Sequence, residues 1–376
     1  MAVRKSRLRD KKMMNRVLEL ARQAEGRTNP NPMVGAVVVD IQGQIVGEGW
    51  HQRAGEAHAE VHALAAAGES AHAGTLYVNL EPCSHMGRTP PCADAVVAAG
   101  LKRVVIAMED PNPLVAGGGI ENLRKAGVEV EVGLMAAEAR QLNEVFLKHI
   151  MSGLPFVALK YAMSMDGKIA ATGGDARWIS GEESRHRVHQ LRNIYDGILL
   201  GIGSVLSDDP LLNTRLAGAA DIHHPRRIIA DPLLVLPLNS RIAKTAKEYP
   251  TIIFCSVEAE LSRAEALAER GIEIRIIAGD KESVDLNSLL KILYREEEIC
   301  SLLVEGGSGI NAAMVRQGLA DKLYCFIAPK IIGGRQAPGP VDDLGIERVA
   351  EAIAVGMENI SVIGSDIMVE GYFNVD

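Results

Sequence analysis

Apolar residues in the first part of the chain recur at two alternating periods. Met14, Val17 and Leu18 follow the spacing of one helical face, which predicts a first helix ending near Gly26. Short runs rich in β-branched residues come next, separated by glycine, proline or further helical spacing. We predict strands at 34–39 and 44–47 joined across Gly43, a helix opening at His58, a strand at 75–80, a helix at 92–99, a strand at 103–107, a helix after Gly119, a strand at 128–132 and a long helix at 136–149.

The pattern restarts after residues 152–155, which are the best candidate for a domain boundary. Buried strands are expected at 156–161, 197–200, 227–230, 251–255, 272–277, 301–304 and 323–328, alternating with short helices or loops. Ser180 and Glu183 have the spacing of a capping box that opens a helix running to about Asn193. The sequence therefore predicts two α/β domains, residues 1–153 and 154–376.

Composition and charge narrow the class of protein. A hydrophobic content of 47% over 376 residues suffices for two cores, and a net charge of −8 argues against a nucleic-acid substrate. The basic run at 4–12 is not followed by an apolar segment, so we interpret it as a solvated, frayed end rather than a targeting signal. Since no stretch approaches about 18 apolar residues, no membrane span is expected.

Two of the five cysteines, together with one histidine, form the strongest chemical motif. His58-Ala59-Glu60 is followed by Pro82-Cys83 and Pro91-Cys92. One His and two Cys thiolates are a ligand set that catalytic zinc accepts while a fourth position stays open for water. Glu60 is placed to move protons, because zinc lowers the pKa of bound water to about 7 but a shuttle is still needed. The motif matches the zinc-deaminase signature except that eight residues, not two, separate the cysteines.

His62 is a rival ligand, since His58 and His62 are spaced i, i+4 along a helix. In the peptidase motif H-E-x-x-H, however, the glutamate directly follows the first histidine, and here it does not. We interpret His62 as a helix-face or core residue. Because residues i and i+2 do not face each other on a regular helix, His58 is expected at the very first turn. The other cysteines, Cys255, Cys300 and Cys325, lie in apolar surroundings and suggest free thiols in a reducing cytoplasm.

Two stretches of the second half also contain groups suited to binding a ligand. Residues 305–309, Glu-Gly-Gly-Ser-Gly, follow a strand and precede a helix, where bare N–H groups can hold a pyrophosphate, although a glycine turn alone is a weak signal. A side chain at Gly307 or Gly309 is expected to displace such a ligand or to conflict with a positive φ. Residues 204–215 form a polar loop with one arginine, which by itself is more typical of a capped surface turn. The run Gly117-Gly118-Gly119 lacks the context of a phosphate loop and is interpreted as a turn.

Together, these motifs resemble the bifunctional deaminase-reductases of riboflavin biosynthesis over roughly residues 13–372. The eight-residue cysteine gap is that family's own spacing. Matching motifs in the first half are Asn31-Pro32-Met33-Val34-Gly35, Gly55-Glu56-Ala57-His58-Ala59-Glu60, Leu80-Glu81-Pro82-Cys83-Ser84-His85 and Asp110-Pro111-Asn112-Pro113. Matching motifs in the second half are Met165-Asp166-Gly167-Lys168, Trp178-Ile179-Ser180, Asp208-Asp209-Pro210-Leu211-Leu212 with Arg215, and Val304-Glu305-Gly306-Gly307.

The resemblance implies a cytidine-deaminase-like three-layer α/β/α domain followed by a dihydrofolate-reductase-like α/β domain. It implies one zinc ion per chain and hydrolytic deamination of a phosphorylated diaminopyrimidinone ribosylamine. It further implies NADPH-dependent reduction of the ribosyl group to a ribityl chain. The family commonly assembles through its reductase half, so a homo-oligomer is expected.

The resemblance also assigns contacts residue by residue. The deaminase substrate would contact Asn31, His51, Ser84, His85 and Arg88, the last as a phosphate ligand. NADPH would contact Ala162, Trp178, Ser204, Asp208, Ser256, Gly307, Ser308, Gly309, Ile310, Asn311, Ala312 and Ala313. The reductase substrate would contact Ala176, Arg192, Leu212, Arg215 and Glu305, with the two arginines suited to a ribose phosphate.

Two other classes of protein compete with this interpretation. A binding or regulatory protein on a degenerate deaminase scaffold would have lost Glu60 or a cysteine ligand, and all of these are present. A nucleic-acid-editing deaminase would need a basic groove, which an acidic chain does not suggest.

Overall fold

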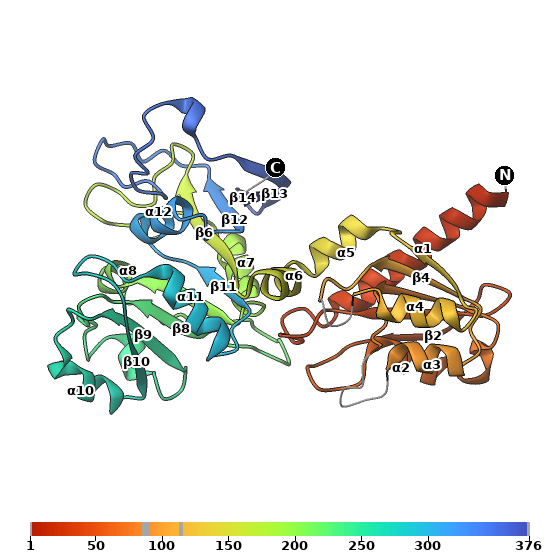
Figure 1. Ribbon diagram of the computed structural model, residues 1–376. Coiled ribbons are helices and arrows are strands. Elements are labelled where there is room, and N and C mark those ends of the chain that lie inside the picture. The colour runs from red at the N-terminus through yellow and green to blue at the C-terminus, as the bar shows by residue number, and fades with distance from the viewer. Residues whose placement is uncertain (1, 85–90, 113–115, 374–376) are drawn as a thin grey trace. The chain divides into compact units, whose positions relative to one another are not determined.

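The computed structural model describes residues 2–84, 91–112 and 116–373, apart from the side chains of residues 2–6 and 261. The chain divides into two compact units, Met1–Gly153 and Leu154–Asp376 (Figure 1). We call them unit 1 and unit 2. The prediction of an α/β fold in both parts is confirmed, and each unit has its own sheet.

Within the described residues, unit 1 holds a five-stranded sheet in the order β2-β1-β3-β4-β5. β1 is antiparallel to both β2 and β3, whereas β3, β4 and β5 run parallel. The strands are β1 (Gly35–Val39), β2 (Ile45–Trp50), β3 (Thr75–Leu80), β4 (Arg103–Met108) and β5 (Glu129–Val132). The helices are α1 (Ala2–Arg22), α2 (Ala59–Ala67), α3 (Cys92–Ala98), α4 (Gly118–Lys125), α5 (Ala136–Leu142) and α6 (Glu144–Ser152), with a short 3₁₀ helix at Gly68–Ala71.

Two helices cover opposite faces of this sheet at very short range. A Cβ on Gly35 would lie 2.2 Å from the Val17 carbonyl oxygen of α1, and one on Gly49 would lie 2.6 Å from the Ala59 carbonyl oxygen of α2. Gly49 pairs with Ala36, the neighbour of Gly35, so the two close approaches are on different faces. α5 packs on the α1 side against β3 and β4, and α3 and α4 continue the α2 side. Unit 1 is thus a three-layer α/β/α domain.

The structure corrects two predictions in unit 1. The long helix at 136–149 is two helices, α5 and α6, which are separated at Asn143. The Asn143 side chain accepts from the Met33 N–H and donates to the Met33 carbonyl, so this residue leaves regular helix geometry to serve another segment. The basic run at the chain start is not frayed, because it belongs to α1. Asp10 anchors α1 by accepting hydrogen bonds from Tyr77 and Arg103 of the sheet.

Unit 2 holds, among the described residues, a nine-stranded sheet in the order β10-β9-β8-β7-β11-β6-β12-β14-β13. The first seven strands in this order are parallel, and β14 and β13 are antiparallel additions. The strands are β6 (Phe156–Ser164), β7 (Gly197–Gly201), β8 (Arg226–Ala230), β9 (Thr251–Ser256), β10 (Ile272–Ile277), β11 (Ser301–Val304), β12 (Lys322–Ala328), β13 (Val355–Ile363) and β14 (Asp366–Phe373).

Alternate residues of the parallel strands face two separate cores. Leu199 and Ile228 belong to the core beneath α11 and α12, whereas Ile198 and Ile229 belong to the core beneath α8, α9 and α10. Since both faces are covered, the strands read as continuous apolar runs. The helices are α7 (Glu182–Arg192), α8 (Ile202–Asp208), α9 (Arg241–Lys244), α10 (Ala264–Ala268), α11 (Leu286–Arg295) and α12 (Ser308–Arg316), with 3₁₀ helices at Leu261–Arg263 and Val349–Glu351.

Two features of unit 2 differ from the sequence predictions. The hairpin of β13 and β14 was not predicted, because the exposed face of β13 breaks the apolar run used to find strands. The predicted capping box is also wrong, because α7 begins at Glu182 after Gly181 and has no side-chain cap. Instead, the Asp366 carboxylate of β14 accepts hydrogen bonds from the Gly181 N–H and the Ser184 hydroxyl.

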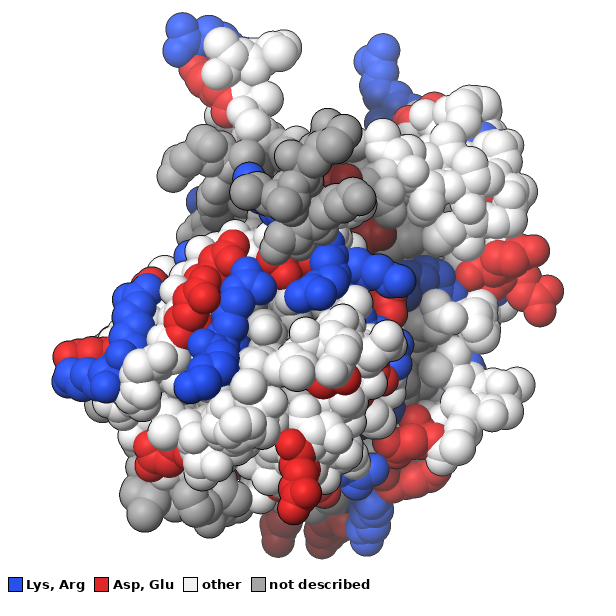
Figure 2. Space-filling model, turned by 90° about the vertical axis from the view of Figure 1, so that its right-hand side faces the viewer, with Lys and Arg blue, Asp and Glu red and all other residues white. Residues whose placement is uncertain are grey.

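On the face drawn in Figure 2, Lys and Arg side chains lie among Asp and Glu side chains rather than in one extended area of a single sign. Arg103 of β4 forms ion pairs with Asp10 and Glu131. Among the described residues, no helix combines the length and the apolar composition needed to cross a bilayer.

Candidate active sites

Three predicted metal ligands converge where β3 ends and two helices begin. His58 is the N-cap of α2 with extended backbone (φ −73, ψ 162), Cys83 follows β3, and Cys92 is the first residue of α3. The expectation that His58 stands at the very start of its helix is confirmed. Because His58 is extended, its side chain and that of Glu60 can approach the same point although only two positions separate them.

The donor atoms have the spacing of a tetrahedral metal site. Those of His58, Cys83 and Cys92 all lie within 4.8 Å of one another. His58 Nδ1 is 3.2 Å from Cys92 Sγ and 3.6 Å from Cys83 Sγ. Tetrahedral zinc with bonds of about 2.0 Å to nitrogen and about 2.3 Å to sulfur places such donors about 3.5 Å apart. The residues therefore fit zinc, and we call them the zinc site.

The two thiols affect each other's ionisation. Hydrogen bonds from Cys92 and His58 lower the pKa of Cys83, whereas the hydrogen bond to Cys83 and burial raise the pKa of Cys92. Two thiols this close can both ionise only when a cation shares them. This is a further match between the donor set and a divalent metal ion.

Glu60 lies in the first turn of α2, beside the zinc site, and is 3% exposed. Burial raises the pKa of its carboxyl to about 7, with His58 opposing that shift. A carboxyl with a pKa near the working pH can both accept and return a proton. His62, the rival ligand, is not part of the donor cluster found among the described residues.

Asn31 and His51 form a polar pair next to the zinc site. His51 Nδ1 contacts the Ala57 carbonyl oxygen at 3.1 Å and must carry the proton there, so His51 Nε2 accepts from Asn31 Nδ2 at 3.1 Å. The imidazole also packs edge-on against His58, with ring centroids 5.6 Å apart. The Asn31 amide oxygen is therefore the group of this pair that can accept a hydrogen bond from a ligand.

Glu81 is a buried carboxylate that the sequence interpretation missed. It accepts hydrogen bonds from the backbone N–H groups of Asp110, Gly117 and Ile120, and so ties the residues before Cys83 to the start of α4. An acidic residue directly before Pro-Cys was the available signal. Ser84 lies against the first turn of α4, since a Cβ on Gly118 would be 2.6 Å from its hydroxyl. The predicted contacts His85 and Arg88 lie outside the described residues.

In unit 2 the predicted cofactor residues gather at the carboxyl ends of neighbouring strands. Ala162 is on β6, Ser204 and Asp208 are on α8 after β7, and the residues from Gly307 to Ala313 form the N-cap and first turns of α12 after β11. β7, β11 and β6 are adjacent in the sheet. Open α/β sheets bind ligands at this edge, where the strand order reverses.

Some details of that region differ from expectation. Neither Gly307, with φ −74, nor Gly309 has a positive φ, so neither needs to be glycine for that reason. Close approach is the remaining reason at Gly307, whose added Cβ would lie 3.0 Å from the Ser204 hydroxyl.

Ser256 is buried, and its hydroxyl already donates to the Pro232 carbonyl. Trp178 is 66% exposed and stacks with the Arg185 guanidinium.

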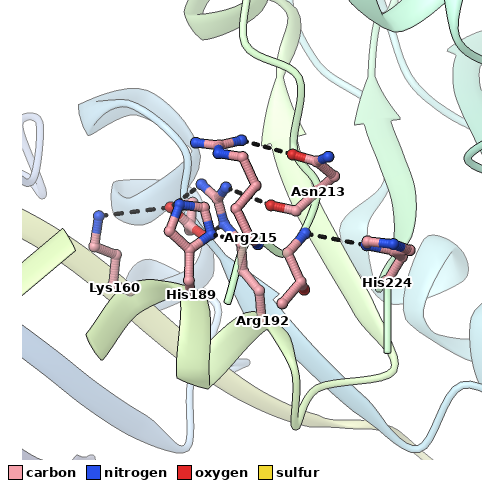
Figure 3. Close-up of polar contacts among 8 residues, drawn as sticks. Lys160, His189, Arg192, Asn213, Arg215 and His224 are labelled. Atoms are coloured by element: carbon pink, nitrogen blue, oxygen red, sulfur yellow. Dashed lines mark hydrogen bonds and ion pairs between the residues drawn. The ribbon is translucent and has the colours of Figure 1, made fainter. Parts of the chain in front are cut away.

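Next to that edge, a carboxylate is paired with two cations from different elements (Figure 3). Glu305, after β11, accepts from Arg192 of α7 at 2.6 and 2.9 Å, and Lys160 of β6 lies 3.5 Å away. Burial opposes ionisation of Glu305, but Arg192 and Lys160 outweigh it and lower its pKa to about 2. Glu305 is therefore a fixed negative charge that orients Arg192.

Arg215 extends this cluster, and among the described residues its guanidinium contacts the Asn213 amide rather than a carboxylate. Its Nη1 donates to the Asn213 side-chain oxygen at 2.6 Å. Burial and the nearby Arg192 lower its pKa, as expected of a guanidinium whose charge is not neutralised. We call Lys160, Arg192, Asn213, Arg215 and Glu305 the anion site, because three cations face one carboxylate.

Two predicted substrate contacts, Leu212 and Ala176, are not among the residues of the anion site. Leu212 directly precedes Asn213 in the chain and has a φ of 55°. Ala176 lies in the loop between β6 and α7. Sequence interpretation missed Lys160, His189 and Asn213. A lysine within an otherwise apolar strand was the one signal for Lys160, whereas nothing distinguishes His189 among the polar residues of α7.

Comparison with known proteins finds a matching family for each unit. Residues 8–108 match the family described as cytidine and deoxycytidylate deaminase zinc-binding region, and residues 155–369 match the RibD C-terminal domain. The chain is 43% identical to riboflavin biosynthesis protein RibD of Actinobacillus pleuropneumoniae, over 95% of this chain and 93% of that protein. It is 44% identical to RibD of Aquifex aeolicus, over 96% and 97% of the two chains.

Solved structures give the same result. Acinetobacter baumannii RibD matches with a TM-score of 0.85 and 35% identity, covering 98% of this chain and 100% of that one. A Thermotoga maritima protein, described as a diaminohydroxyphosphoribosylaminopyrimidine deaminase and 5-amino-6-(5-phosphoribosylamino)uracil reductase, matches with a TM-score of 0.84 and 37% identity over 98% and 99% of the two chains.

Fold, donor set and comparisons define a two-domain enzyme in which a zinc-binding deaminase domain precedes a reductase domain. The chain belongs to the RibD family of bifunctional riboflavin biosynthesis enzymes.

Proposed function

We propose that unit 1 hydrolytically deaminates 2,5-diamino-6-ribosylamino-4(3H)-pyrimidinone 5′-phosphate. Unit 2 then reduces the ribosyl group with NADPH to give 5-amino-6-ribitylaminouracil 5′-phosphate. The observation that carries the first step is the zinc site with buried Glu60 beside it. The observation that carries the second is an anion site next to the ligand-binding edge of a parallel sheet. The name of the Thermotoga maritima relative supports the same pair of reactions.

In the deaminase step, His58, Cys83 and Cys92 would hold zinc, which would lower the pKa of a bound water to about 7 and so make hydroxide available at neutral pH. Glu60 takes the proton of the attacking water and later delivers a proton to the departing ammonia. Its raised pKa suits both transfers, since neither protonation state is strongly disfavoured. Asn31 and His51 hold the pyrimidine ring through the amide oxygen that their mutual hydrogen bond leaves available. We assign Ser84, His85 and Arg88 to the same substrate.

In the reductase step, the C1′–O4′ bond of the ribosyl ring breaks to give an open-chain imine; NADPH would supply the hydride that adds to C1′ while the imine nitrogen takes a proton, so the protein mainly positions two ligands. Arg192 and Arg215 bind the phosphate, for which a guanidinium pair is well suited. Glu305 holds Arg192 in place and, with Lys160, borders the ribose. Ala176 and the backbone of Leu212, whose side chain packs in the core, complete the substrate contacts. We assign Ala162, Trp178, Ser204, Asp208, Ser256 and residues 307–313 to NADPH.

The test is turnover by the purified protein. Supplied with the diaminopyrimidinone substrate and NADPH, it should release one ammonia and oxidise one NADPH per product. Without NADPH, ammonia release should continue and the deaminated intermediate should accumulate. Absence of ammonia release from zinc-loaded protein would contradict the deaminase assignment. Failure to oxidise NADPH with the deaminated intermediate would contradict the reductase assignment.

We further propose that the enzyme works in the cytoplasm as a homo-oligomer joined through unit 2. β13 is at the edge of its sheet and exposes Met357, Ile360 and Val362 at 57, 64 and 78%. An apolar edge strand is a surface that proteins usually cover. The free thiols of Cys255, Cys300 and Cys325 fit a reducing compartment. Light scattering should give a mass above that of one chain, and Ile360→Asp should lower it; a monomeric wild type would contradict this proposal.

A further inference from the structure

Asn213 contacts both arginines of the anion site. Its backbone oxygen accepts from Arg192 Nη1 at 3.1 Å, and its side-chain oxygen accepts from Arg215 Nη1 at 2.6 Å. Figure 3 shows the Arg215 side chain extending past Arg192 to reach this oxygen. The distances make the second bond the shorter one, and it joins a charged donor to a neutral acceptor.

The backbone around Asn213 is held independently of its side chain. The N–H groups of Thr214 and Arg215 donate to Nδ1 of His224 and His189, at 3.2 and 3.3 Å. Leu212 before it is 3% exposed and packs in the core. The main chain of this segment is therefore fixed, and what the Asn213 side chain determines is the direction of the long, flexible Arg215 side chain.

Because the Asn213 amide is a neutral acceptor, it leaves the net positive charge of the anion site unchanged. Glu305 already neutralises one cation of the site, and a second carboxylate on Arg215 would leave little net positive charge for a ligand. An amide oxygen holds a guanidinium without cancelling its charge. Nδ2 of the same amide donates to the Tyr249 hydroxyl at 3.3 Å, which fixes which end of the amide faces Arg215.

We propose that Asn213 is a positioning residue of the reductase, which aims the Arg215 guanidinium at the substrate phosphate while leaving its charge available. This inference rests on the proposed function, since it names the residue through which Arg215 recognises the phosphate. Asn213 itself need not touch the substrate.

A double-mutant cycle tests this role. The four proteins are wild type, Asn213→Ala, Arg215→Ala and the double variant, and the readouts are the reductase KM for the deaminated substrate and the inhibition constant of inorganic phosphate. In the wild-type background, Asn213→Ala should raise both roughly 10-fold with kcat within about twofold, as for loss of one hydrogen bond to a charged group. In the Arg215→Ala background it should change them less than about twofold.

Asn213→Asp separates positioning from a merely structural role. The carboxylate keeps the shape and still accepts from Arg215, but it neutralises the guanidinium, so KM and the phosphate inhibition constant should exceed those of Asn213→Ala. A structural role predicts the reverse order, because aspartate is the closer replacement. Ammonia release and NADPH binding by the same variants report folding, and Asn287→Ala, at an exposed asparagine of α11, is the matched control.

The outcomes are distinct. An equal effect of Asn213→Ala in both backgrounds, an Asp variant milder than the Ala variant, or an unchanged KM in Asn213→Ala would each overturn the inference. Wild-type protein that neither oxidises NADPH with this substrate nor binds phosphate would instead contradict the proposed reductase function.

Discussion

The zinc site draws its three donors from the 35 residues between His58 and Cys92, whereas the anion site draws its side chains from the 146 residues between Lys160 and Glu305. A metal ion accepts few donor types at fixed distances, so its ligands leave a short and specific motif. A phosphate needs positive charge and N–H donors, which many loops can bring to one place. This difference explains why the zinc site can be predicted from the spacing of its residues in the sequence, whereas the anion site is found only from contacts in the structure.

Metal removal should separate the two units most strongly. Chelation of zinc, or Cys83→Ser, should abolish ammonia release, because no other group among the described residues of the site activates water. NADPH oxidation with the deaminated substrate should be unchanged. Elemental analysis should find one zinc per chain in the wild type. Zinc-free protein that still releases ammonia would remove the contrast between the units.

Glu60→Gln should give the next largest effect. The amide keeps the shape of the carboxyl but cannot move protons, so ammonia release should fall by roughly 10² to 10⁴-fold. Zinc content and the reductase rate should match the wild type. If ammonia release stays near the wild-type rate, the proton shuttle must be another residue.

Gly307→Val tests whether unit 2 binds NADPH at the N-terminus of α12. A Cβ there would meet the Ser204 hydroxyl at 3.0 Å, and a branched side chain would reach the N–H groups that are proposed to hold the pyrophosphate. Calorimetry should show that most NADPH affinity is lost, roughly 10-fold or more on the scale of one lost charge-assisted hydrogen bond. Gly309→Ala is the milder comparison, since a Cβ there has open space around it. Equal affinity of the Gly307→Val variant and the wild type would place the cofactor elsewhere.

The smallest effect concerns His189. Burial first, and then Arg192 and Arg215, lower its pKa from 6.5 to about 4. Between these pH values the unfolded chain binds a proton that the folded chain does not, so the stability of unit 2 should fall as pH drops from 6.5 toward 4. His189→Asn keeps an acceptor for the Arg215 N–H and should show a shallower decline.

Urea unfolding at pH 7 and pH 5, followed by Trp178 fluorescence in a Trp50→Phe background, measures this difference. Trp50 is in unit 1 and Trp178 in unit 2, so the background reports on unit 2 alone. Identical pH dependence in the two proteins would show that His189 does not titrate in this window.

The sequence predicted the α/β class and the convergence of His58, Cys83 and Cys92 because local signals determine both. Proline before each cysteine and the start of a helix at His58 and Cys92 leave little freedom in where these side chains lie. The residue roles assigned to NADPH and to both substrates stay predictions.

What could not be predicted depends on partners distant in the chain. Asn143 interrupts a helix because it bonds Met33, 110 positions earlier, and Asp366 replaces the predicted cap of α7 from 185 positions away. The Asn213 carbonyl likewise accepts from Arg192 of α7, 21 positions earlier. No window of local sequence contains these pairs.

The position of β11 in its sheet affects how the chain is made. β6 pairs with β11 and β12, and Phe156 faces Ser301, 145 positions later. At a synthesis rate of about 5–20 residues per second, roughly 7–30 s pass between the synthesis of β6 and that of β11. All strands of unit 1 have been synthesised by then. During that interval β6 is an apolar strand without a pairing partner. Unit 2, rather than unit 1, is therefore the part of this protein that most depends on chaperones during synthesis, because pairing between strands far apart in the sequence is slow and leaves the chain exposed to aggregation.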